Sequence, residues 1–420
     1  MYARPMVKDY SDVAELTGLC DVNPRRMEVA RSWIGRDIPG FTDFDEMLDK
    51  VPCDVVIVTS KDSTHHEYII KALRRGKDVI TEKPMTIDAE KCRAILAAER
   101  ESKGHITVTF NYRFTPYTTR IKELLREGIV GDIYSVEFHW FLDTLHGADY
   151  YRRWHRRKEN SGGLLVHKAT HHFDIVNWWL EAEPRLVYAR GKRRVYGSAG
   201  KFRGERCRTC SHTQECPFYF DLASDERAKE LYISAEHIDG YYRDSCVFAE
   251  EIDIEDTMAL LVEYKNGIQM SYTLSSYMPF EGWRMAINGS KGRLELSVAD
   301  AFYSTEAVNL KERASIRKSI DPFKAALGDM SPETSDLIRF YPTFGGVKTF
   351  EVKRALGGHG GGDERLRDML FREGIPDPLG HMAGSWAGAM SILIGIAANE
   401  SIATGRPVII EDLLKGFPEG

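Results

Sequence analysis

Thr81-Glu82-Lys83-Pro84-Met85 is the stretch that decides how this 420-residue chain is expected to fold and work. It follows an apolar run, residues 77–80, which predicts a short buried strand. In an open α/β sheet, ligands bind beyond the carboxyl ends of the strands, so this turn stands where a site forms. Proline restricts its own φ to about −65°, so Lys83 projects from a stiff backbone. Such a lysine can hold a substrate hydroxyl and favour alkoxide character as a hydride leaves, although a plain surface turn is the alternative.

The flanking sequence alternates strands and helices, which is typical of a parallel, doubly wound sheet. The predicted strands are 14–21, 54–59, 77–80 and 105–111, and the predicted helices are 1–10, 24–34, 44–49, 65–75 and 88–101. The strand 54–59 is apolar without a break, which predicts burial on both faces. Asp21 ends the first strand, where a dinucleotide fold holds the hydroxyls of the adenosine ribose, although an aspartate there can equally be a turn former.

After Pro116 the pattern changes to the alternation of half-buried antiparallel strands. The predicted strands are 134–140, 185–190, 257–264, 268–274, 284–288 and 292–296, and the predicted helices are 117–127, 364–371 and 383–404. Lys265-Asn266-Gly267 predicts a hairpin turn between two of these strands. We therefore expect a Rossmann-like domain over residues 1–115. An α+β domain with an open, mostly antiparallel sheet should follow over residues 116–420, with its last helix packing back on the first domain.

Composition narrows the class of protein. A hydrophobic content of 43% and a charged content of 29% are typical of a globular protein, and a net charge of −6 gives no reason to expect nucleic acid. The most apolar run, residues 387–397, is too short for a membrane span and predicts a buried helix. No signal-peptide core opens the chain, and seven cysteines do not suggest a secreted disulfide framework. We expect a cytoplasmic protein, unless an export signal precedes Met1.

The second informative stretch, residues 161–174, places two glycines before a helix with three histidines. On one helix His167 and His171 share a face, and Lys168 and His172 share the next. An imidazole titrates near neutral pH, so a histidine here can take a hydroxyl proton while a hydride departs. Histidines four residues apart can also bind zinc, but the glutamate of a zinc-peptidase helix is missing. We expect a catalytic role, since three histidines in six residues beside a lysine are hard to explain by structure alone.

Cysteines form a third cluster. Cys207, Cys210 and Cys216 lie close together in the sequence and Cys246 follows, a spacing that fits a structural four-thiolate zinc site with His212 as a rival ligand. Four free thiols in a core are the alternative, but the surrounding loop is polar and a poor place for buried apolar thiols.

Four motifs together resemble the glucose–fructose oxidoreductase, inositol dehydrogenase and MocA family. Residues 20–24 are similar to its second-strand motif, and residues 58–60 with His65 to its loop over the nicotinamide ribose. Residues 82–84 are its Glu-Lys-Pro signature, and residues 162–174 resemble its glycine- and histidine-bearing helix. The resemblance runs from the first residue to about residue 288 and returns in the last helix.

The resemblance implies a role for each matching residue. Lys83 would hold the substrate hydroxyl, His171 would accept its proton, and His167 would stand beside them as a third catalytic group. The cofactor cleft would be lined by Asp21, Asn23, Thr59, Ser60, His65, Glu82, Lys83 and Asn111. On the substrate side we expect Lys168, His172, Arg113 and, from the glycine loop 357–363, His359 with Asp363. Family members are dimers or tetramers, so a homodimer or homotetramer is expected.

Two departures from the family pattern matter. Most members have an aspartate where this chain has His167, which changes the usual substrate contact. A first strand and a G-x-G-x-x-G turn, whose backbone amides hold the pyrophosphate, should precede Met1. We expect that the chain is clipped there rather than that the turn is lost.

We therefore expect an enzyme that moves a hydride between a secondary hydroxyl of a sugar, glycoside or cyclitol and NAD. NADP is less favoured, because the Asp21 carboxylate would repel a 2′-phosphate. One rival is a glycoside hydrolase that retains NAD, oxidises the sugar transiently, eliminates the aglycone and reduces again. Another rival is a non-catalytic sugar-binding paralogue. The partner is a small sugar or polyol, with neither nucleic acid nor a membrane.

Overall fold

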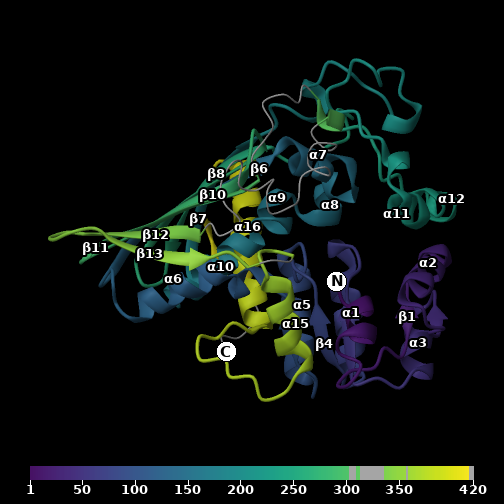
Figure 1. The fold of residues 1–420 in the computed structure, drawn as a ribbon, viewed down its shortest axis with the longest axis horizontal. Coiled ribbons are helices and arrows are strands. Elements are labelled where there is room, and N and C mark those ends of the chain that lie inside the picture. The colour runs from purple at the N-terminus through teal and green to yellow at the C-terminus, as the bar shows by residue number, and fades with distance from the viewer. Residues whose placement is uncertain (302–308, 313–334, 356–357, 416–420) are drawn as a thin grey trace.

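A computed structural model describes residues 1–301, 309–312, 335–355 and 358–415. Two domains divide the chain, with helices around a small parallel sheet in one and a large open sheet in the other (Figure 1). The first domain contains the helices α1 (Ala3–Lys8), α2 (Pro24–Ile34), α3 (Phe44–Lys50), α4 (His65–Arg74) and α5 (Ala89–Glu101), the short 3₁₀ helix η1 (Asp62–Thr64), and the strands β1 (Leu19–Cys20), β2 (Gly40–Phe41), β3 (Val55–Val58), β4 (Asp78–Thr81) and β5 (Ile106–Val108).

The parallel sheet of the first domain is in two parts. Strands β3, β4 and β5 pair in parallel, while β1 and β2 pair only with each other. Within the described residues no strand joins β1 to β3, so β3 is bonded along one edge only. Two predictions are therefore wrong in detail: β1 covers two residues rather than the predicted 14–21, and Val55 in β3 is 41% exposed rather than buried.

Local capping explains where the helices of this domain begin and end. The Asn23 side chain accepts the Arg25 backbone N–H ahead of α2, Pro24 occupies the first helical position, and Gly35 ends the helix at a φ of 72°. Asp88 caps α5 by accepting from the Lys91 backbone N–H. The Rossmann-like helices therefore begin and end close to the predicted positions.

The second domain is built on a nine-stranded sheet. Its spatial order is β13-β12-β11-β10-β6-β9-β8-β7-β15, and all neighbours are antiparallel except β6 and β9. This confirms the predicted α+β domain with a mostly antiparallel sheet, although β6 was expected to be purely antiparallel, and neither β12 nor the polar edge strand β13 was predicted. The strands are β6 (Ile133–Asp143), β7 (Pro184–Lys192), β8 (Thr257–Tyr264), β9 (Gln269–Met278), β10 (Glu281–Gly289), β11 (Gly292–Ala301), β12 (Ser335–Pro342), β13 (Lys348–Lys353) and β15 (Val408–Ile409).

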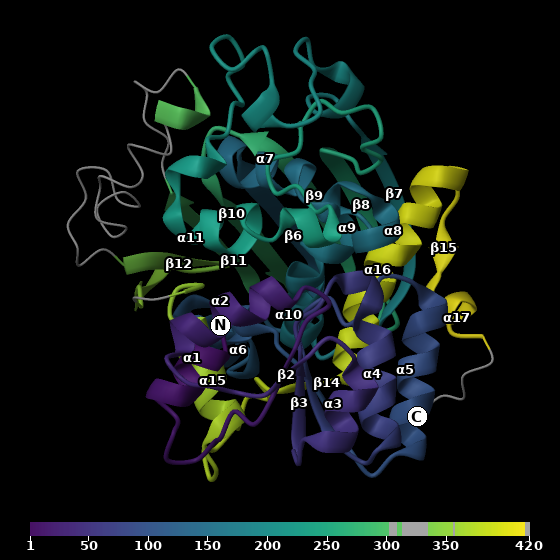
Figure 2. The same ribbon diagram turned by 90° about the vertical axis from the view of Figure 1, so that its right-hand side faces the viewer.

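Helices cover the face of this sheet that looks toward the first domain (Figure 2). They are α6 (Pro116–Arg126), α7 (Thr144–Arg152), α8 (Lys158–Ser161), α9 (Leu164–His167), α10 (Thr170–Leu180), α16 (Ser385–Thr404) and α17 (Ile410–Leu413), with the short 3₁₀ helices η2 (Asn111–Phe114) and η3 (Trp154–Arg156). Helix α15 (Gly362–Phe371) lies instead beside α1, where Phe371 packs on Tyr10 (Figure 2). The hairpin at Gly267 forms as predicted, with Gly267 at a φ of 85°.

Helix α16 connects the two domains. The strand β14 (Ala383–Gly384) just before it pairs with β5, and Gly388 lies so close to Val108 that an added Cβ would stand 2.9 Å from its side chain. The apolar run 387–397 was predicted to be too short to cross a membrane, but the helix that contains it, α16, has 20 residues. It is the one helix among the described residues with the length and apolar composition of a span, and 61% of its most apolar window is buried inside the protein.

A long excursion between β7 and β8 reaches back to the first domain. Its helical segments α11 (Glu226–Ala228), η7 (Lys229–Ile233) and α12 (Glu236–Asp239) lie beside α2 (Figure 1). Asn23 donates to the Ala235 carbonyl over 3.0 Å, and Arg26 pairs with Asp239 at 2.6 Å. This excursion therefore joins the second-strand motif to the second domain.

Candidate active site

Lys83 lies in the turn after β4 and reaches from the first domain to the second. Its Nζ donates a hydrogen bond of 2.9 Å to the backbone carbonyl of His167. The Lys83–Pro84 peptide is cis. Burial, and next the charge of the nearby Lys168, lower the pKa of Lys83 to about 8 against the opposing effect of Asp62. An ammonium that loses its proton this readily is a strong hydrogen-bond donor to a substrate oxygen.

The histidine stretch forms two short helices rather than the single helix that was predicted. Helix α9 ends at His167, and α10 begins two residues after Lys168. Burial lowers the pKa of both His167 and His171 well below the usual value, and the Lys83 charge is the next largest cause for each. Both rings are therefore neutral at neutral pH, and a neutral imidazole has one nitrogen that can accept a proton.

His171 stands at the inner end of this cluster. Its ring packs against Phe110 at a centroid distance of 6.1 Å and against Tyr112 at 5.0 Å. Its Nδ1 is buried and has no hydrogen-bond partner among the described residues. The Lys168 ammonium lies 4.9 Å from the Trp140 ring centroid. The unpaired Nδ1 of His171, near the ammonium groups of Lys83 and Lys168, can therefore accept a hydrogen bond from a bound hydroxyl.

The glycine loop comes close to the same place. The Asn111 amide donates to Nδ1 of His359 over 2.9 Å and to Asp363 over 2.7 Å. The His359 ring lies 6.2 Å from the His171 ring and 5.4 Å from Tyr112. The structure thus brings His359 into contact with the residues of the cleft.

The predicted cofactor residues divide into two groups. Asp21, Thr59, Ser60, Glu82 and Asn111 lie at the ends of β1, β3, β4 and β5. The Asp21 side chain is 38% exposed, and burial raises its pKa. The Asn111 Oδ1 is buried without a partner among the described residues, which suits a donor from a ligand.

The other two, Asn23 and His65, have their polar atoms committed within the protein. Asn23 is fully buried, caps α2 and holds Ala235. The two ring nitrogens of His65 lie 2.9 Å from the carbonyl oxygens of Ser60 and Pro84, and the one that carries the proton donates to its carbonyl. Both residues therefore hold the backbone that borders the cleft.

The nicotinamide end of a dinucleotide fits these residues better than the phosphate end. Glu82, Asn111 and the loop at Thr59 offer polar groups at the ends of adjacent strands, where such a ligand binds. Tyr2 donates a hydrogen bond of 2.8 Å to Glu82, so that carboxylate already has a partner.

Two predicted substrate residues belong to the core instead. Arg113 forms a two-point ion pair with Asp174, with bonds of 2.6 and 2.7 Å, and also donates to the Gly380 carbonyl. His172 is fully buried, stacks on Trp140 at 3.9 Å and bonds the Tyr272 hydroxyl at 2.7 Å. The polar groups of Arg113 are paired within the protein, and the His172 ring is closed off from the surface, with its Nδ1 bonded and its buried Nε2 without a partner among the described residues.

We predict that Arg113→Met lowers the free energy of unfolding by about 3–5 kcal/mol, because it leaves the Asp174 carboxylate buried and unpaired. Urea denaturation measures this loss. The double variant Arg113→Met with Asp174→Leu should recover much of it, since no charge then remains buried. If Arg113→Met instead keeps the wild-type stability and raises KM, Arg113 contacts the substrate.

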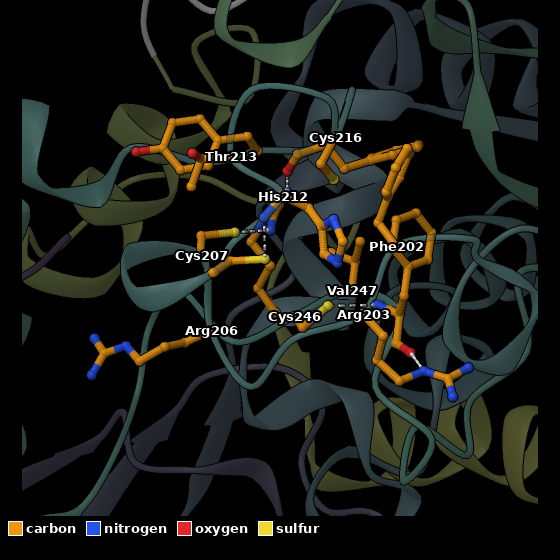
Figure 3. A pocket seen from close by; sticks show the side chains of 14 residues that line it. Phe202, Arg203, Arg206, Cys207, His212, Thr213, Cys216, Cys246 and Val247 are labelled. Carbon is orange, nitrogen blue, oxygen red and sulfur yellow. Dashed lines mark hydrogen bonds between the residues drawn. The ribbon is translucent and has the colours of Figure 1, made fainter.

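The four cysteines of the predicted zinc site line one cavity, together with His212 (Figure 3). All are free thiols. Cys207 accepts a hydrogen bond from Arg152, while the Cys210 and Cys246 sulfurs accept backbone N–H groups two residues further on. Across the described residues, no group of three or more His, Cys, Asp or Glu side chains is arranged to hold a metal ion. Neither the predicted thiolate site nor the alternative zinc site at His167 and His171 is therefore formed in this structure.

Asp62 is the main residue of the site that the sequence did not reveal. It lies in η1, and its carboxylate is 2.5 Å from Nδ1 of His167. His155 packs edge-on against His167 at 4.1 Å, and Tyr150 lies 5.5 Å from it. The one signal for Asp62 in the sequence is its position, three residues before His65 and just beyond a predicted strand.

Comparison with protein families gives two matches that together span most of the chain. A profile described as the NAD-binding Rossmann fold of an oxidoreductase family, GFO_IDH_MocA, matches residues 1–110. A profile of the C-terminal alpha/beta domain of the same family matches residues 122–410. The chain is 37% identical to the putative oxidoreductase YteT of Bacillus subtilis (strain 168), over 99% of this chain and 96% of that protein.

More distant relatives match in part. The chain is 27% identical to inositol 2-dehydrogenase of Rhizobium meliloti (strain 1021), over 42% of this chain and 50% of that protein. The solved structure of the WlbA dehydrogenase of Bordetella pertussis, in complex with NADH and UDP-GlcNAcA, superposes with a TM-score of 0.61 at 18% identity, over 97% of this chain and 94% of that one. An oxidoreductase of Agrobacterium radiobacter in complex with NAD+, L-tartaric acid and magnesium gives a TM-score of 0.63 at 16% identity, over 98% and 96%. These structures share the fold.

Proposed function

The chain belongs to the glucose–fructose oxidoreductase, inositol dehydrogenase and MocA family of NAD(P)-dependent dehydrogenases, and from that premise we propose that it moves a hydride between a secondary hydroxyl of a sugar, glycoside or cyclitol and nicotinamide. The observation that carries the proposal is the convergence of Lys83, from the first domain, with His167 and His171, from the second. The name of inositol 2-dehydrogenase, borne by a partial relative, supports a cyclitol or sugar as the substrate class.

In this proposal Lys83 and His171 share the reacting hydroxyl. His171 accepts the hydroxyl proton, since its burial keeps the ring neutral and its Nδ1 unpaired. Lys83 donates a hydrogen bond to the oxygen as negative charge develops on it. Lys168, above the Trp140 ring, and His359 border the same space and would orient the remaining hydroxyls. A nicotinamide cofactor, when bound, accepts the hydride.

We propose NAD rather than NADP as the cofactor. Asp21, Thr59, Ser60, Glu82 and Asn111 would hold it, with the adenosine ribose at Asp21. A partly exposed carboxylate at that position accepts ribose hydroxyls and repels a 2′-phosphate.

The proposal predicts how activity depends on pH. Lys83 must keep its proton to stabilise an alkoxide, and its pKa is lowered to about 8. The value of kcat/KM for alcohol oxidation should therefore fall as pH rises through about 8, because the ammonium fraction is lost there. The acid limb should lie below the ordinary histidine pKa, since the pKa of His171 is lowered. A profile that keeps rising above pH 8 would show that Lys83 acts as a neutral base.

Incubation of the protein with NAD or NADP and a panel of sugars, glycosides and cyclitols tests the proposed function. Net NADH formation, faster with NAD than with NADP, is the expected result. Release of an aglycone without net NADH would replace the dehydrogenase with the NAD-retaining hydrolase. Sugar binding by calorimetry with no turnover of any kind would identify a non-catalytic paralogue.

A further inference from the structure

Asp62 is a buried carboxylate beyond β3 to which the proposed reaction assigns no role. Its side chain is 4% exposed, and its Oδ2 lies 2.5 Å from Nδ1 of His167, whose side chain is 12% exposed. The two residues come from different domains and are 105 positions apart in the sequence. A buried carboxylate is costly unless it is paired, so this contact is part of how the two domains meet.

The contact closes a ring of hydrogen bonds around the catalytic lysine. The His65 ring lies between the Ser60 loop and the turn after β4, with its two nitrogens each 2.9 Å from a carbonyl oxygen, of Ser60 and of Pro84, and its one N–H donates to one of the two. Lys83, next to Pro84, donates to the His167 carbonyl, and His167 bonds Asp62 in the same loop as Ser60. The loop after β3, the turn after β4 and the end of α9 therefore hold one another in place.

Resting on the proposed function, we propose that Asp62 is the positioning residue of this active site: its carboxylate holds the His167 ring, and the pair fixes the Lys83 ammonium at the substrate hydroxyl. A misplacement of about 1 Å in a reacting group can lower the rate by about 10²-fold, so a residue that only positions Lys83 has a large effect.

The protonation of the pair follows from its burial. Burial raises the pKa of Asp62 well above its ordinary value, and burial lowers the pKa of His167. An imidazolium is thus disfavoured, and the neutral His167 ring donates its Nδ1–H to Asp62, whose carboxylate is kept charged by the Lys83 ammonium that opposes the rise in its pKa. The His167 ring is held in one orientation by this bond, at the position where the sequence departs from the family pattern.

Several charged and titratable groups face this pair from the elements packed around it. They are Lys83 and Glu82 from the turn after β4, Arg153 and His155 from the segment after α7, Tyr150 from α7, and Lys168 after α9. Of these, Lys83 is the largest charge acting on Asp62, and Asp62 is the largest carboxylate charge acting on Lys83. Removal of the Asp62 carboxylate should therefore lower the pKa of Lys83.

The test measures the titration of Lys83 directly and does not depend on turnover. The rate at which Lys83 is acetylated is followed against pH by mass spectrometry in the wild type, Asp62→Asn and Asp62→Glu. We expect a midpoint at about pH 8 in the wild type, a midpoint lower by about one pH unit or more in Asp62→Asn, and a midpoint near the wild-type value in Asp62→Glu. Asp336→Asn is the control, since Asp336 is an equally buried carboxylate paired with Arg354 in the large sheet.

If the wild type is active, Asp62→Asn should also lower kcat by about 10²-fold. The alkaline limb of its pH profile should lie at a lower pH than in the wild type. Asp336→Asn should change neither kcat nor this limb. An unchanged Lys83 midpoint and an unchanged kcat in folded Asp62→Asn overturn the proposal. Where Asp62→Asn does not fold, Asp62→Glu decides, because a wild-type kcat in that variant contradicts a positioning role. If the wild type shows no turnover, the proposed function is contradicted but the positioning role is still tested, because the acetylation midpoint of Lys83 depends on the Asp62–His167 pair and not on catalysis.

Discussion

Lys83→Met should lower kcat for oxidation of a secondary alcohol by about 10²–10³-fold. The ammonium is the one hydrogen-bond donor that the account places at the developing alkoxide, and it is held there by the His167 carbonyl at 2.9 Å. Methionine keeps the length of the side chain and removes both the charge and the donor. Because Lys83 acts mainly on the transition state, KM for the alcohol should change much less than kcat.

Lys61→Met is the matched control for this loss. Lys61 is an exposed lysine on the loop after β3, so its substitution removes a charge near the cleft without touching the proposed site. Equal losses in the two variants would mean that general positive charge, rather than the Lys83 donor, supports the reaction. Steady-state kinetics with circular dichroism of each variant distinguishes the two results.

His171→Asn should lower kcat by about 10²–10⁴-fold, the range of a lost general base. Asparagine can still form hydrogen bonds, but it does not take a proton at neutral pH. The acid limb of the pH profile should disappear with it, since that limb reports protonation of the His171 ring. Measurement of kcat across pH in the wild type and the variant gives both results.

His105→Asn is the control for the histidine. His105 is exposed and lies just before β5, at the opposite end of the strand from the cleft. Its substitution should leave kcat and the pH profile as in the wild type. Retention of most of the activity in His171→Asn would assign the proton to another group, such as His167 or His359, whose ring lies 6.2 Å from the His171 ring.

The residues proposed as catalytic could be singled out from the sequence because they lie in strong local patterns. Lys83 follows a strand and precedes a proline, and His171 lies in a run of histidines after two glycines. Each signal is contained in a few neighbouring residues. The strand-helix alternation was equally local, which is why α2 and α5 begin and end close to their predicted residues.

Features that depend on partners distant in the sequence could not be predicted. Asp62 looks like any loop aspartate until the chain brings His167 against it. Arg113 has suitable chemistry, but Asp174 pairs with it in the fold, and His172 is enclosed by Trp140 and Tyr272, far along the chain from it. The break between α9 and α10 leaves the spacing of the histidines unchanged, so it left no mark in the pattern.

The sheet shows the same limit. The apolar run of β3 predicted burial on both faces, but Val55 is exposed because β3 pairs only with β4. Strand β13 carries mostly polar, exposed residues at the edge of the large sheet, and such a strand has no apolar face for a pattern to reveal.

The most direct test of the account is a crystal structure of the protein with NAD(H) and a cyclitol or sugar that it turns over. The account predicts one hydroxyl oxygen within hydrogen-bond distance of both Lys83 Nζ and a ring nitrogen of His171, with the carbon that bears it facing the nicotinamide. A ligand whose hydroxyls contact neither residue, or a reacting carbon on the far side of the cleft from both, would contradict it.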